Sequence, residues 1–288
     1  MVRRAAVLGS PVAHSLSPVL HGAAYAALGL RDWTYERVEC TAEDLPGLVA
    51  GLDETWVGLS VTMPGKRAAL AVATGATDRA RRLGVANTLV RSGDGWAADC
   101  TDVEGIAGAL RAAGIREPAP LAAGLYDVVV LGAGATASAA VGAMAVLGNE
   151  DVQLVVRDPA RAGDTAAVID AYGMRRLVRT FDALDEVDLS RAKALVNTTP
   201  AGAVDAAVAD RLVAGLPEGA VVLDAVYHPW PTPLAAAAQA RGLAVATGLD
   251  MLLHQAFGQV EQFTGMAAPR REMHRALVRA TDFAVRPP

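Results

Sequence analysis

Lys66 is the residue best suited to acid–base chemistry in this sequence. The chain contains only two lysines, Lys66 and Lys193, among 26 lysine and arginine residues. Arginine keeps its proton in proteins, whereas a partly buried lysine can titrate near neutral pH. Lys66 follows an apolar run and the turn Pro64-Gly65, and this position predicts a proton donor. A solvated surface lysine is the alternative, and the stretch by itself does not distinguish the two.

Asp102 is the second candidate for acid–base chemistry. It stands at the predicted start of a helix that reaches about Ala113. Thr101 is suited to the N-cap position, which would place Asp102 in the first helical turn. The helix dipole favours a negative charge there, so Asp102 is expected to be ionised. An aspartate at a helix start with no further role is the alternative interpretation.

Ser15 and Ser17 lie where a small anion could bind. A strand over residues 3–8 is expected to be followed by a helix over residues 18–28, with Ser17 as its N-cap. Small ligands bind at the carboxyl ends of strands in open α/β sheets, and the N–H groups of a helix start attract carboxylates. The pair therefore predicts a carboxylate site, with a purely structural cap as the alternative for Ser17.

A glycine-rich turn predicts a nucleotide-binding site. Residues 128–131 indicate a strand, Gly132-Ala133-Gly134 a turn, and the residues that follow a helix. Gly132 would make the tight turn, Gly134 would let the backbone approach a pyrophosphate, and the small Ala137 would allow close packing of strand and helix. The uncharged stretch 128–149 is thus better explained by a buried strand and helix than by a membrane span.

The residues after the next strand, at 152–156, bear on the choice of nucleotide. Arg157 and Arg161 suit the 2′-phosphate of NADP, because a guanidinium binds phosphate in a bidentate manner. Asp158 would suit the free 2′-hydroxyl of NAD. We expect NADP, because Asp158 is also suited to cap a helix, and NAD is the alternative.

Strands and helices alternate along the chain, which predicts an α/β fold. Further strands are expected at residues 33–39, 56–61, 86–91, 96–99, 176–181, 194–196, 220–223 and 243–246. Further helices are expected at 42–52, 248–257 and 269–283, with two short ones between 64 and 83. A rigid turn is expected at Pro229, Pro231 and Pro233.

Composition excludes several classes of protein. The chain is 52% hydrophobic and 20% charged with a formal net charge of −5, which indicates a globular protein without a general attraction to nucleic acid or to anionic membranes. Cys40 and Cys100 form no CxxC pair, so both are expected to be reduced thiols in a cytoplasmic protein. The five histidines are scattered, no metal-binding spacing is present, and no histidine is expected to be catalytic.

Several short motifs, taken in order, resemble the shikimate dehydrogenase family. They are His14-Ser15-Leu16-Ser17-Pro18, Val61-Thr62-Met63-Pro64-Gly65-Lys66, Ala86-Asn87-Thr88, Thr101-Asp102, the glycine-rich turn, Tyr227-x-Pro229, Thr232-Pro233-Leu234 and Gly248 with Gln255-Ala256. The resemblance covers nearly the whole chain. It implies NADPH-dependent reduction of 3-dehydroshikimate to shikimate in aromatic amino-acid biosynthesis.

The resemblance also implies an organisation and a set of site residues. A substrate domain at 1–104, completed by C-terminal helices at 250–288, would accompany a Rossmann-type, doubly wound parallel sheet at 105–249, with a proline-containing linker at 115–124. Lys66 and Asp102 would form the catalytic pair. The substrate would be held by Ser15, Ser17, Thr62, Asn87, Tyr227 and Gln255, and NADP by Gly132, Ala133, Gly134, Ala135, Thr136, Arg157, Arg161, Ala225 and Gly248.

The chain departs from the family pattern at a few positions. Cys100 replaces the usual asparagine before Thr101-Asp102, Ala135 replaces a glycine of the turn, and Val156 and Asp158 flank the phosphate-reading arginine. These changes bear on cofactor preference more than on reaction type. An NAD-dependent quinate/shikimate dehydrogenase and a non-catalytic NADP(H)-binding regulator are the alternative functions. The oligomeric state stays open, with a homodimer as one option.

Overall fold

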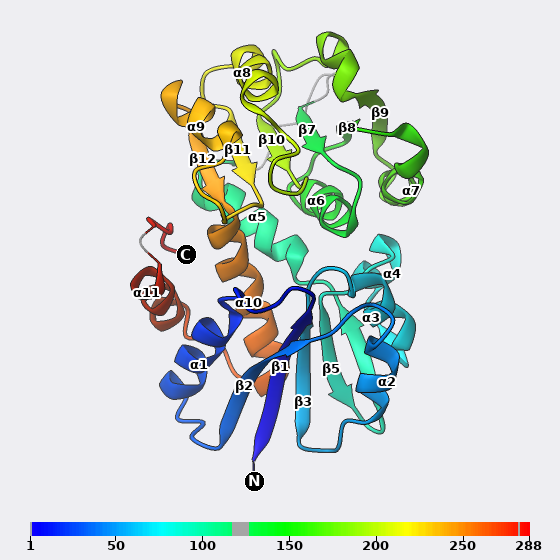
Figure 1. Ribbon diagram of the computed structural model, residues 1–288, viewed down its shortest axis with the longest axis vertical. Coiled ribbons are helices and arrows are strands. Elements are labelled where there is room, and N and C mark those ends of the chain that lie inside the picture. The colour runs from blue at the N-terminus through cyan, green and yellow to red at the C-terminus, as the bar shows by residue number, and fades with distance from the viewer. Residues whose placement is uncertain (1, 117–126, 282) are drawn as a thin grey trace. The chain divides into compact units, whose positions relative to one another are not determined.

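The chain divides into two compact units, each built on one sheet. The computed structural model describes residues 2–116, 127–281 and 283–288, so most of the predicted linker at 115–124 lies outside the described residues. Unit 1 consists of Met1–Gly105 and Leu252–Pro288, and unit 2 of Ile106–Met251. Each contains a six-stranded sheet accompanied by helices (Figure 1), which confirms the predicted α/β fold.

The N-terminal part of the chain supplies the sheet of unit 1. Its elements are β1 (Arg3–Gly9), α1 (Ser17–Ala27), β2 (Trp33–Glu39), α2 (Leu45–Ala50), β3 (Trp56–Val61), α3 (Lys66–Val72), β4 (Gly75–Ala76), α4 (Asp78–Leu83), β5 (Thr88–Ser92), β6 (Gly95–Asp99) and α5 (Asp102–Ala112). The C-terminal helices α10 (Gly248–Thr264) and α11 (Arg270–Ala280) follow at the end of the chain. The division between the units falls inside α5, after Gly105, and inside α10, before Leu252.

The strand order of unit 1 brings several loops to one edge of its sheet. The order is β2-β1-β3-β5-β6-β4. β1, β2 and β3 are parallel, whereas β5 runs antiparallel to both β3 and β6. The start of β5 therefore pairs with the ends of its neighbours, since Thr88 is opposite both Ser60 and Asp99. The residues after β1, β3 and β6 and those before β5 thus meet at the same edge.

The central strands β1 and β3 of unit 1 are largely buried, as expected for strands covered by helices on each side, whereas the residues of β2 are half-buried or exposed. Ala6, Leu8 and Leu59 belong to a core cluster that includes Leu45 of α2 and Ala69 of α3. Helices α1 and α10 lie on the other side in Figure 1. A Cβ atom built on Gly58 of β3 would lie 2.1 Å from the ring of Phe263, so α10 packs directly against the backbone of this strand.

Unit 2 contains the remaining elements. They are β7 (Val128–Leu131), α6 (Ala135–Val146), β8 (Asp151–Val156), η1 (Pro159–Arg161), α7 (Gly163–Ala171), β9 (Arg175–Thr180), η2 (Phe181–Glu186), β10 (Ala194–Asn197), α8 (Ala206–Gly215), β11 (Val221–Asp224), α9 (Pro233–Ala240) and β12 (Ala244–Thr247).

The sheet of unit 2 has the order of a dinucleotide-binding domain. The order is β12-β11-β10-β7-β8-β9, and all its pairings are parallel. Taken from the first strand of the unit, this is the doubly wound order 3-2-1-4-5-6, whose direction reverses between β7 and β10. Ligands bind at such a switch point, beside the carboxyl ends of the strands. The predicted doubly wound parallel sheet is confirmed.

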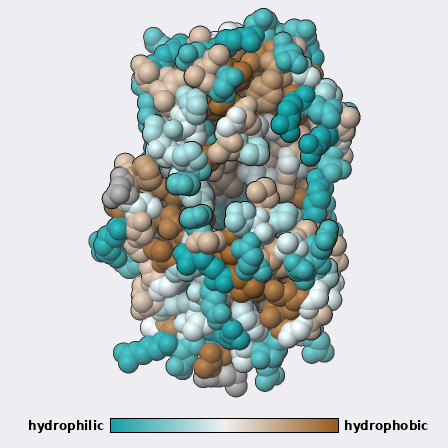
Figure 2. Space-filling view, viewed as in Figure 1, coloured by the Kyte–Doolittle hydropathy of each residue, from teal (hydrophilic) through white to brown (hydrophobic). Residues whose placement is uncertain are grey.

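The uncharged stretch 128–149 forms β7 and α6, as predicted. Residues 137–144 of α6 are all buried, which explains their lack of charge. No helix among the described residues is long and apolar enough to cross a membrane. On the face shown in Figure 2, hydrophobic side chains form several small patches among polar residues rather than one continuous surface.

The structure corrects two local predictions and adds one short strand. The helix predicted at 42–52 begins only at Leu45, because Thr41 and Asp44 hydrogen-bond to each other and hold a turn before it. Pro233 starts α9 instead of extending the proline turn, since the hydroxyl of Thr232 caps that helix by accepting from Ala235 N–H. The two-residue strand β4 was not predicted, because such a short pairing leaves no periodicity in the sequence.

Candidate active site

A buried ion pair between Lys66 and Asp102 is the centre of the candidate site. Lys66 Nζ lies 2.5 Å from Asp102 Oδ2, and the two side chains are 11% and 6% exposed. The other lysine, Lys193, pairs with Asp127 but is 48% exposed. Lys66 is therefore the buried lysine that the sequence indicated, and the alternative of a solvated surface residue is wrong.

The pKa of Lys66 is raised, and not lowered towards neutrality. Burial by itself lowers the pKa of the ammonium, because it removes the charge from water. The charge of Asp102 and the hydrogen bond to it outweigh that effect, so the pKa lies above its usual value of 10.5. Lys66 is thus an ammonium throughout the neutral range and holds a proton that it can donate.

The sheet topology explains why these two residues meet. Lys66 is the first residue of α3, just after β3, and Asp102 is the first residue of α5, just after β6. Both loops leave the same edge of the sheet of unit 1. Asp102 lies in the first turn of its helix, as predicted.

Asn87 connects Asp102 to its neighbours. Its Nδ2 donates to Asp102 Oδ1 at 2.9 Å and to Thr101 Oγ1 at 3.0 Å, and its Oδ1 accepts from Thr101 N–H at 2.7 Å. The Oε1 atom of Gln255 lies 3.3 Å from the same Nδ2 atom. The structure therefore brings four predicted residues, Lys66, Asn87, Asp102 and Gln255, into one hydrogen-bonded group. The hydroxyl of Thr101, which we expected to cap α5, joins this group.

The serine loop is arranged differently from the prediction. Ser17 is the first residue of α1 and not its N-cap, which is Leu16. Ser15 lies one position further out, and its Oγ accepts from Ser17 N–H at 3.3 Å. The predicted N-cap is wrong because Ser15 and Ser17 are both good capping residues, and the sequence does not distinguish them. Both hydroxyls still lie at the junction between β1 and α1.

Thr62 and the serine loop are close neighbours. The N–H of Thr62 donates to Leu8 O at 2.8 Å, and that of Ser10 donates to Met63 O at 3.0 Å. A Cβ atom built on Gly9 would lie 2.3 Å from the methyl group of Thr62. Gly9 is thus needed for this contact, and the contact joins the loop that carries the serines to the loop that leads to Lys66.

Arg37 holds the serine loop, a contact that the sequence did not indicate. It lies on β2, and its Nε and Nη2 donate to Ser15 O at 2.8 and 2.6 Å. On the same strand, Glu39 Oε2 accepts from Val12 N–H at 3.2 Å. An arginine on an alternating strand gives no signal of a role, because its partner is a backbone carbonyl far away in the sequence.

Replacing Arg37 with alanine is expected to raise KM for an anionic substrate about tenfold with a small change in kcat, since a charge-assisted hydrogen bond is worth about 1.5–3 kcal/mol. Lysine at this position keeps the charge but cannot donate in the same fork, so it should recover only part of the loss. The control is Arg31→Ala, which removes an exposed charge just before β2. Equal KM values for the Arg37→Ala and Arg31→Ala variants would refute this role.

The turn after β7 has the geometry of a phosphate-binding loop. Gly132 has a φ of 101°, which favours glycine, and a Cβ atom there would lie 2.8 Å from Thr198 Oγ1. The chain then passes Ala133 and Gly134 and enters α6 at Ala135 and Thr136, where the first amides of the helix are available to an anion.

The arginines after β8 are open to a ligand. Arg157 and Arg161 are exposed, and neither side chain makes an ion pair or hydrogen bond to another of the described residues. The carboxylate of Asp158 accepts from Ala160 N–H at 3.0 Å and caps η1. Asp158 thus has the capping role that we considered for it, which leaves the two arginines as the groups suited to a phosphate.

Ala225, Tyr227 and Gly248 belong to unit 2 and lie together there. A Cβ atom on Gly248 would lie 2.3 Å from Ala225 O and 3.1 Å from the ring of Tyr227, so only glycine fits. The fully buried Asp224, which the sequence analysis did not single out, holds this loop by accepting from Val226 N–H at 3.1 Å.

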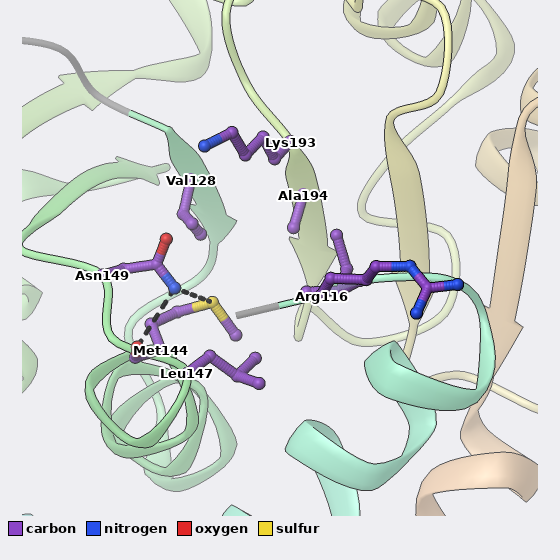
Figure 3. A pocket seen from close by; sticks show the side chains of 8 residues that line it. Arg116, Val128, Met144, Leu147, Asn149, Lys193 and Ala194 are labelled. Carbon is purple, nitrogen blue, oxygen red and sulfur yellow. Dashed lines mark hydrogen bonds between the residues drawn. The ribbon is translucent and has the colours of Figure 1, made fainter. Parts of the chain in front are cut away.

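A small pocket in unit 2 lies at the wrong end of the sheet for this chemistry. Figure 3 shows its lining, which includes Val128 and Ala194, the first residues of β7 and β10. The pocket therefore opens at the amino ends of the strands, whereas ligands of doubly wound sheets bind at the carboxyl ends. Lys193, at its rim, is paired with Asp127 at 2.9 Å. We assign it no part in the site.

Both cysteines are free and buried. Burial raises the pKa of Cys40 and of Cys100, and the negative charge of Asp102 adds to the effect at Cys100. A buried thiol with a raised pKa is a poor nucleophile, so Cys100, which replaces the usual asparagine before Thr101, is not suited to nucleophilic chemistry at neutral pH.

Comparison with known proteins identifies the family. A model of the shikimate dehydrogenase substrate binding domain matches residues 7–89, and a model of the shikimate 5'-dehydrogenase C-terminal domain matches residues 248–278. The NADP(+) shikimate dehydrogenase of Rhodospirillum rubrum is 39% identical over 279 residues, which cover 96% of each chain. The chain belongs to the shikimate dehydrogenase family. The enzyme of the same name from Caulobacter vibrioides is 39% identical over 265 residues, covering 91% of this chain and 89% of that one.

Solved structures of the family agree with this assignment. Mycobacterium tuberculosis shikimate dehydrogenase is 49% identical, with a TM-score of 0.85 over 96% of this chain and 99% of that one. The Thermus thermophilus shikimate 5-dehydrogenase, solved with NADP(H) and shikimate, is 33% identical, with a TM-score of 0.80 over 98% and 100%. A 5-ketofructose reductase of Gluconobacter has the same fold at 24% identity and a TM-score of 0.80, so the fold by itself does not fix the substrate.

Proposed function

We propose that this protein catalyses the reversible, NADPH-dependent reduction of 3-dehydroshikimate to shikimate, with Lys66 and Asp102 as the catalytic pair. The observation that carries the proposal is the buried ion pair at 2.5 Å, held by Asn87 in a chain of this family. A non-catalytic regulator would not need a buried, paired lysine at this position. Membership of the family supports 3-dehydroshikimate as the substrate and NADPH as the cofactor.

Lys66 would donate the proton in this reaction. NADPH, when bound, supplies a hydride to the carbonyl carbon, and negative charge then develops on the carbonyl oxygen. The ammonium of Lys66 stabilises that charge and transfers its proton to the oxygen, which gives the alcohol. Asp102 keeps the amine protonated beforehand and orients it. Water then returns a proton to Lys66.

Unit 1 would be the substrate domain. Ser15 and Ser17 offer hydroxyls to the carboxylate, with Arg37 holding their loop from β2. Asn87, Gln255 and Thr62 offer hydrogen-bonding groups beside Lys66 to the ring hydroxyls and the carbonyl. Tyr227, which the resemblance to the family also assigns to the substrate, lies in unit 2 and would be an additional hydroxyl donor.

Unit 2 would bind NADP, and its residues fit that cofactor. The positive φ of Gly132 and the start of α6 suit a pyrophosphate, and the exposed Arg157 and Arg161 suit a 2′-phosphate. Ala225 and Gly248 offer close backbone approach at the carboxyl ends of β11 and β12.

Replacing Arg157 with alanine is expected to raise KM for NADPH about tenfold or more while KM for NADH changes little, because only NADPH carries the phosphate that the guanidinium would bind. The control is Arg211→Ala, which removes an exposed arginine of α8 that pairs with Asp185. Equal changes for both cofactors would mean that Arg157 does not read the 2′-phosphate.

The test of the proposed function is a matrix of initial rates with purified protein. It combines NADPH or NADH with 3-dehydroshikimate or 3-dehydroquinate. We expect the highest kcat/KM for NADPH with 3-dehydroshikimate. A preference for NADH with both acids would instead identify a quinate/shikimate dehydrogenase, and no turnover in any combination would reject an enzymatic role.

Two further proposals concern the protein in the cell. We propose a cytoplasmic location, as expected for a biosynthetic enzyme that uses NADPH, and a homodimer. Fractionation of the source cells tests the first, and sedimentation velocity of the purified chain tests the second.

A further inference from the structure

We propose that Gln259 is a positioning residue for Asp102 and that it acts through Thr88 and Asn87. This inference rests on the proposed function, since it gives Gln259 a part in that reaction. Gln259 lies on α10, one helical turn after Gln255, and is 1% exposed. A buried amide must satisfy its hydrogen-bonding groups. The NH₂ group of Gln259 faces Asn87 and Thr88, and its oxygen faces Ser60.

The orientation of the Gln259 amide is fixed by an obligate acceptor. Its Nε2 atom lies 3.2 Å from the backbone oxygen of Asn87 and 3.1 Å from Thr88 Oγ1. A carbonyl cannot donate, so the NH₂ group must be on this side. The Oε1 atom then faces Ser60 and accepts its hydroxyl proton at 2.7 Å.

The hydroxyl of Thr88 transmits this orientation to Asn87. Thr88 accepts from Gln259, so its own hydrogen is free to donate to Asn87 Oδ1 at 2.8 Å. Asn87 Oδ1 therefore receives a second donor besides Thr101 N–H. Electron density drawn towards that oxygen makes the NH₂ group of the same amide a stronger donor to Asp102 Oδ1.

The hydrogen bonds on the other side of Gln259 run in the same direction. The hydroxyl of Tyr35 donates to Ser60 Oγ at 2.6 Å, and the ring of Tyr35 stacks on the buried His21 at a centroid distance of 3.9 Å. Each hydrogen bond thus points from Tyr35 towards Asp102. Successive hydrogen bonds of this kind strengthen one another, and the result is a carboxylate whose Oδ1 is held by Asn87 while its Oδ2 faces Lys66.

A measurement of Asn87 in the absence of any reaction tests this inference. The sequence has only three asparagines, Asn87, Asn149 and Asn197, so selective ¹⁵N-asparagine labelling gives three side-chain NH₂ pairs. The Asn87→Ala variant identifies the signal of interest. In Gln259→Met we expect the Asn87 pair to shift and to exchange with solvent about tenfold faster, since a buried hydrogen-bond partner is lost. The signals of Asn149 and Asn197, in unit 2, should not move.

Gln262 provides a matched control on the same helix. Its Nε2 donates to Asp99 Oδ2 at 2.8 Å, whereas the side chain of Asn87 makes no hydrogen bond to Gln262 among the described residues. Asp99 meets Asn87 through the backbone, where its oxygen accepts from Asn87 N–H at 3.1 Å. Gln262→Met removes a hydrogen bond of the same kind, so it reports the effect of a general loosening of α10. We expect it to leave the Asn87 side-chain signal in place and to change kcat less than about twofold, because the Asp99 carboxylate keeps its hydrogen bonds from Thr77 and Arg79.

A double-mutant comparison tests whether Gln259 acts through Asn87. We expect Gln259→Met to lower kcat about tenfold in the native background and to have no further effect in the Asn87→Ala background, because residues that act on one group are not additive. The inference would be overturned if the losses of kcat in Gln259→Met and Asn87→Ala multiplied in the double variant. It would also be overturned if Gln259→Met left the Asn87 signal unchanged. A protein without dehydrogenase activity would reject the proposed function, and the labelling experiment would still decide whether Gln259 holds Asn87.

Discussion

Replacing Lys66 with alanine is expected to lower kcat for the reduction by about 10²–10⁴-fold, the range typical of a lost general acid. The effect on KM should be smaller, because the proton is transferred in the transition state and binding uses other groups. Initial rates with NADPH and 3-dehydroshikimate measure both constants. Retention of near-native kcat would reject the catalytic role of Lys66.

Two further variants separate proton donation from loss of the buried pair. Lysine to alanine leaves Asp102 buried and unpaired, which can cost about 3–5 kcal/mol of stability. Lys66→Arg keeps a positive charge beside Asp102 but does not release its proton, so kcat should stay low even where the protein remains folded. Lys193→Ala removes the other lysine, in unit 2 at the amino end of the sheet, and should leave kcat within about twofold of the native value.

Replacing Asp102 with asparagine is expected to move the pKa of Lys66 from above its usual value of 10.5 to below it. In the native protein the carboxylate raises this pKa and burial lowers it. Asparagine has a similar shape and no charge, so the effect of burial, which is the largest on this pKa, is no longer outweighed by a carboxylate. We also expect kcat to fall about 10²-fold or more, because the amine loses the partner that orients it.

The pKa of Lys66 can be read directly by NMR. Labelling of lysine at Cε gives two signals, since the chain has only Lys66 and Lys193. The native pair stabilises the fold fully below pH 10.5, and this contribution is lost as the pH rises through the raised pKa of Lys66. In the Asp102→Asn variant this alkaline loss should disappear. Stability should instead rise with pH between the lowered pKa of Lys66 and 10.5, because the unfolded chain then binds more protons than the folded one. Asp94→Asn, in the exposed hairpin, is the control, and a Lys66 titration that Asp102→Asn leaves unchanged would show that the pair does not set this pKa.

Much of the local structure could be predicted because its causes are local. The strands Trp33–Glu39 and Trp56–Val61 have the predicted bounds, since alternation and apolar runs reflect the faces that a strand buries. The turn at Gly132 needs a positive φ, and glycine is the residue that adopts it without strain. The N-cap of α1 was predicted wrongly because Ser15 and Ser17 are both good capping residues. The start of α2 was predicted too early because Thr41 and Asp44 hold a turn before it.

The grouping of the site residues could be anticipated only through resemblance to a family. Lys66, Asn87, Asp102 and Gln255 are spread over most of the chain, and no spacing in the sequence relates them. Their meeting depends on the antiparallel placement of β5 between β3 and β6 and on the packing of α10 against Gly58. Arg37 and Gln259 gave no signal at all, because their partners are backbone atoms and side chains from distant segments.

The sequence by itself determined the kinds of chemistry available to this protein: one lysine in a place suited to burial, an aspartate at a helix start, and a glycine turn followed by arginines. The tertiary structure alone decided the state of these groups. A pKa depends on water and charge in the surrounding space, so the sequence could suggest that burial would lower the pKa of Lys66 but could not place Asp102 2.5 Å away. Because Asp102 is so close, the pKa of Lys66 is raised instead of lowered, and the lysine keeps its proton until it donates it.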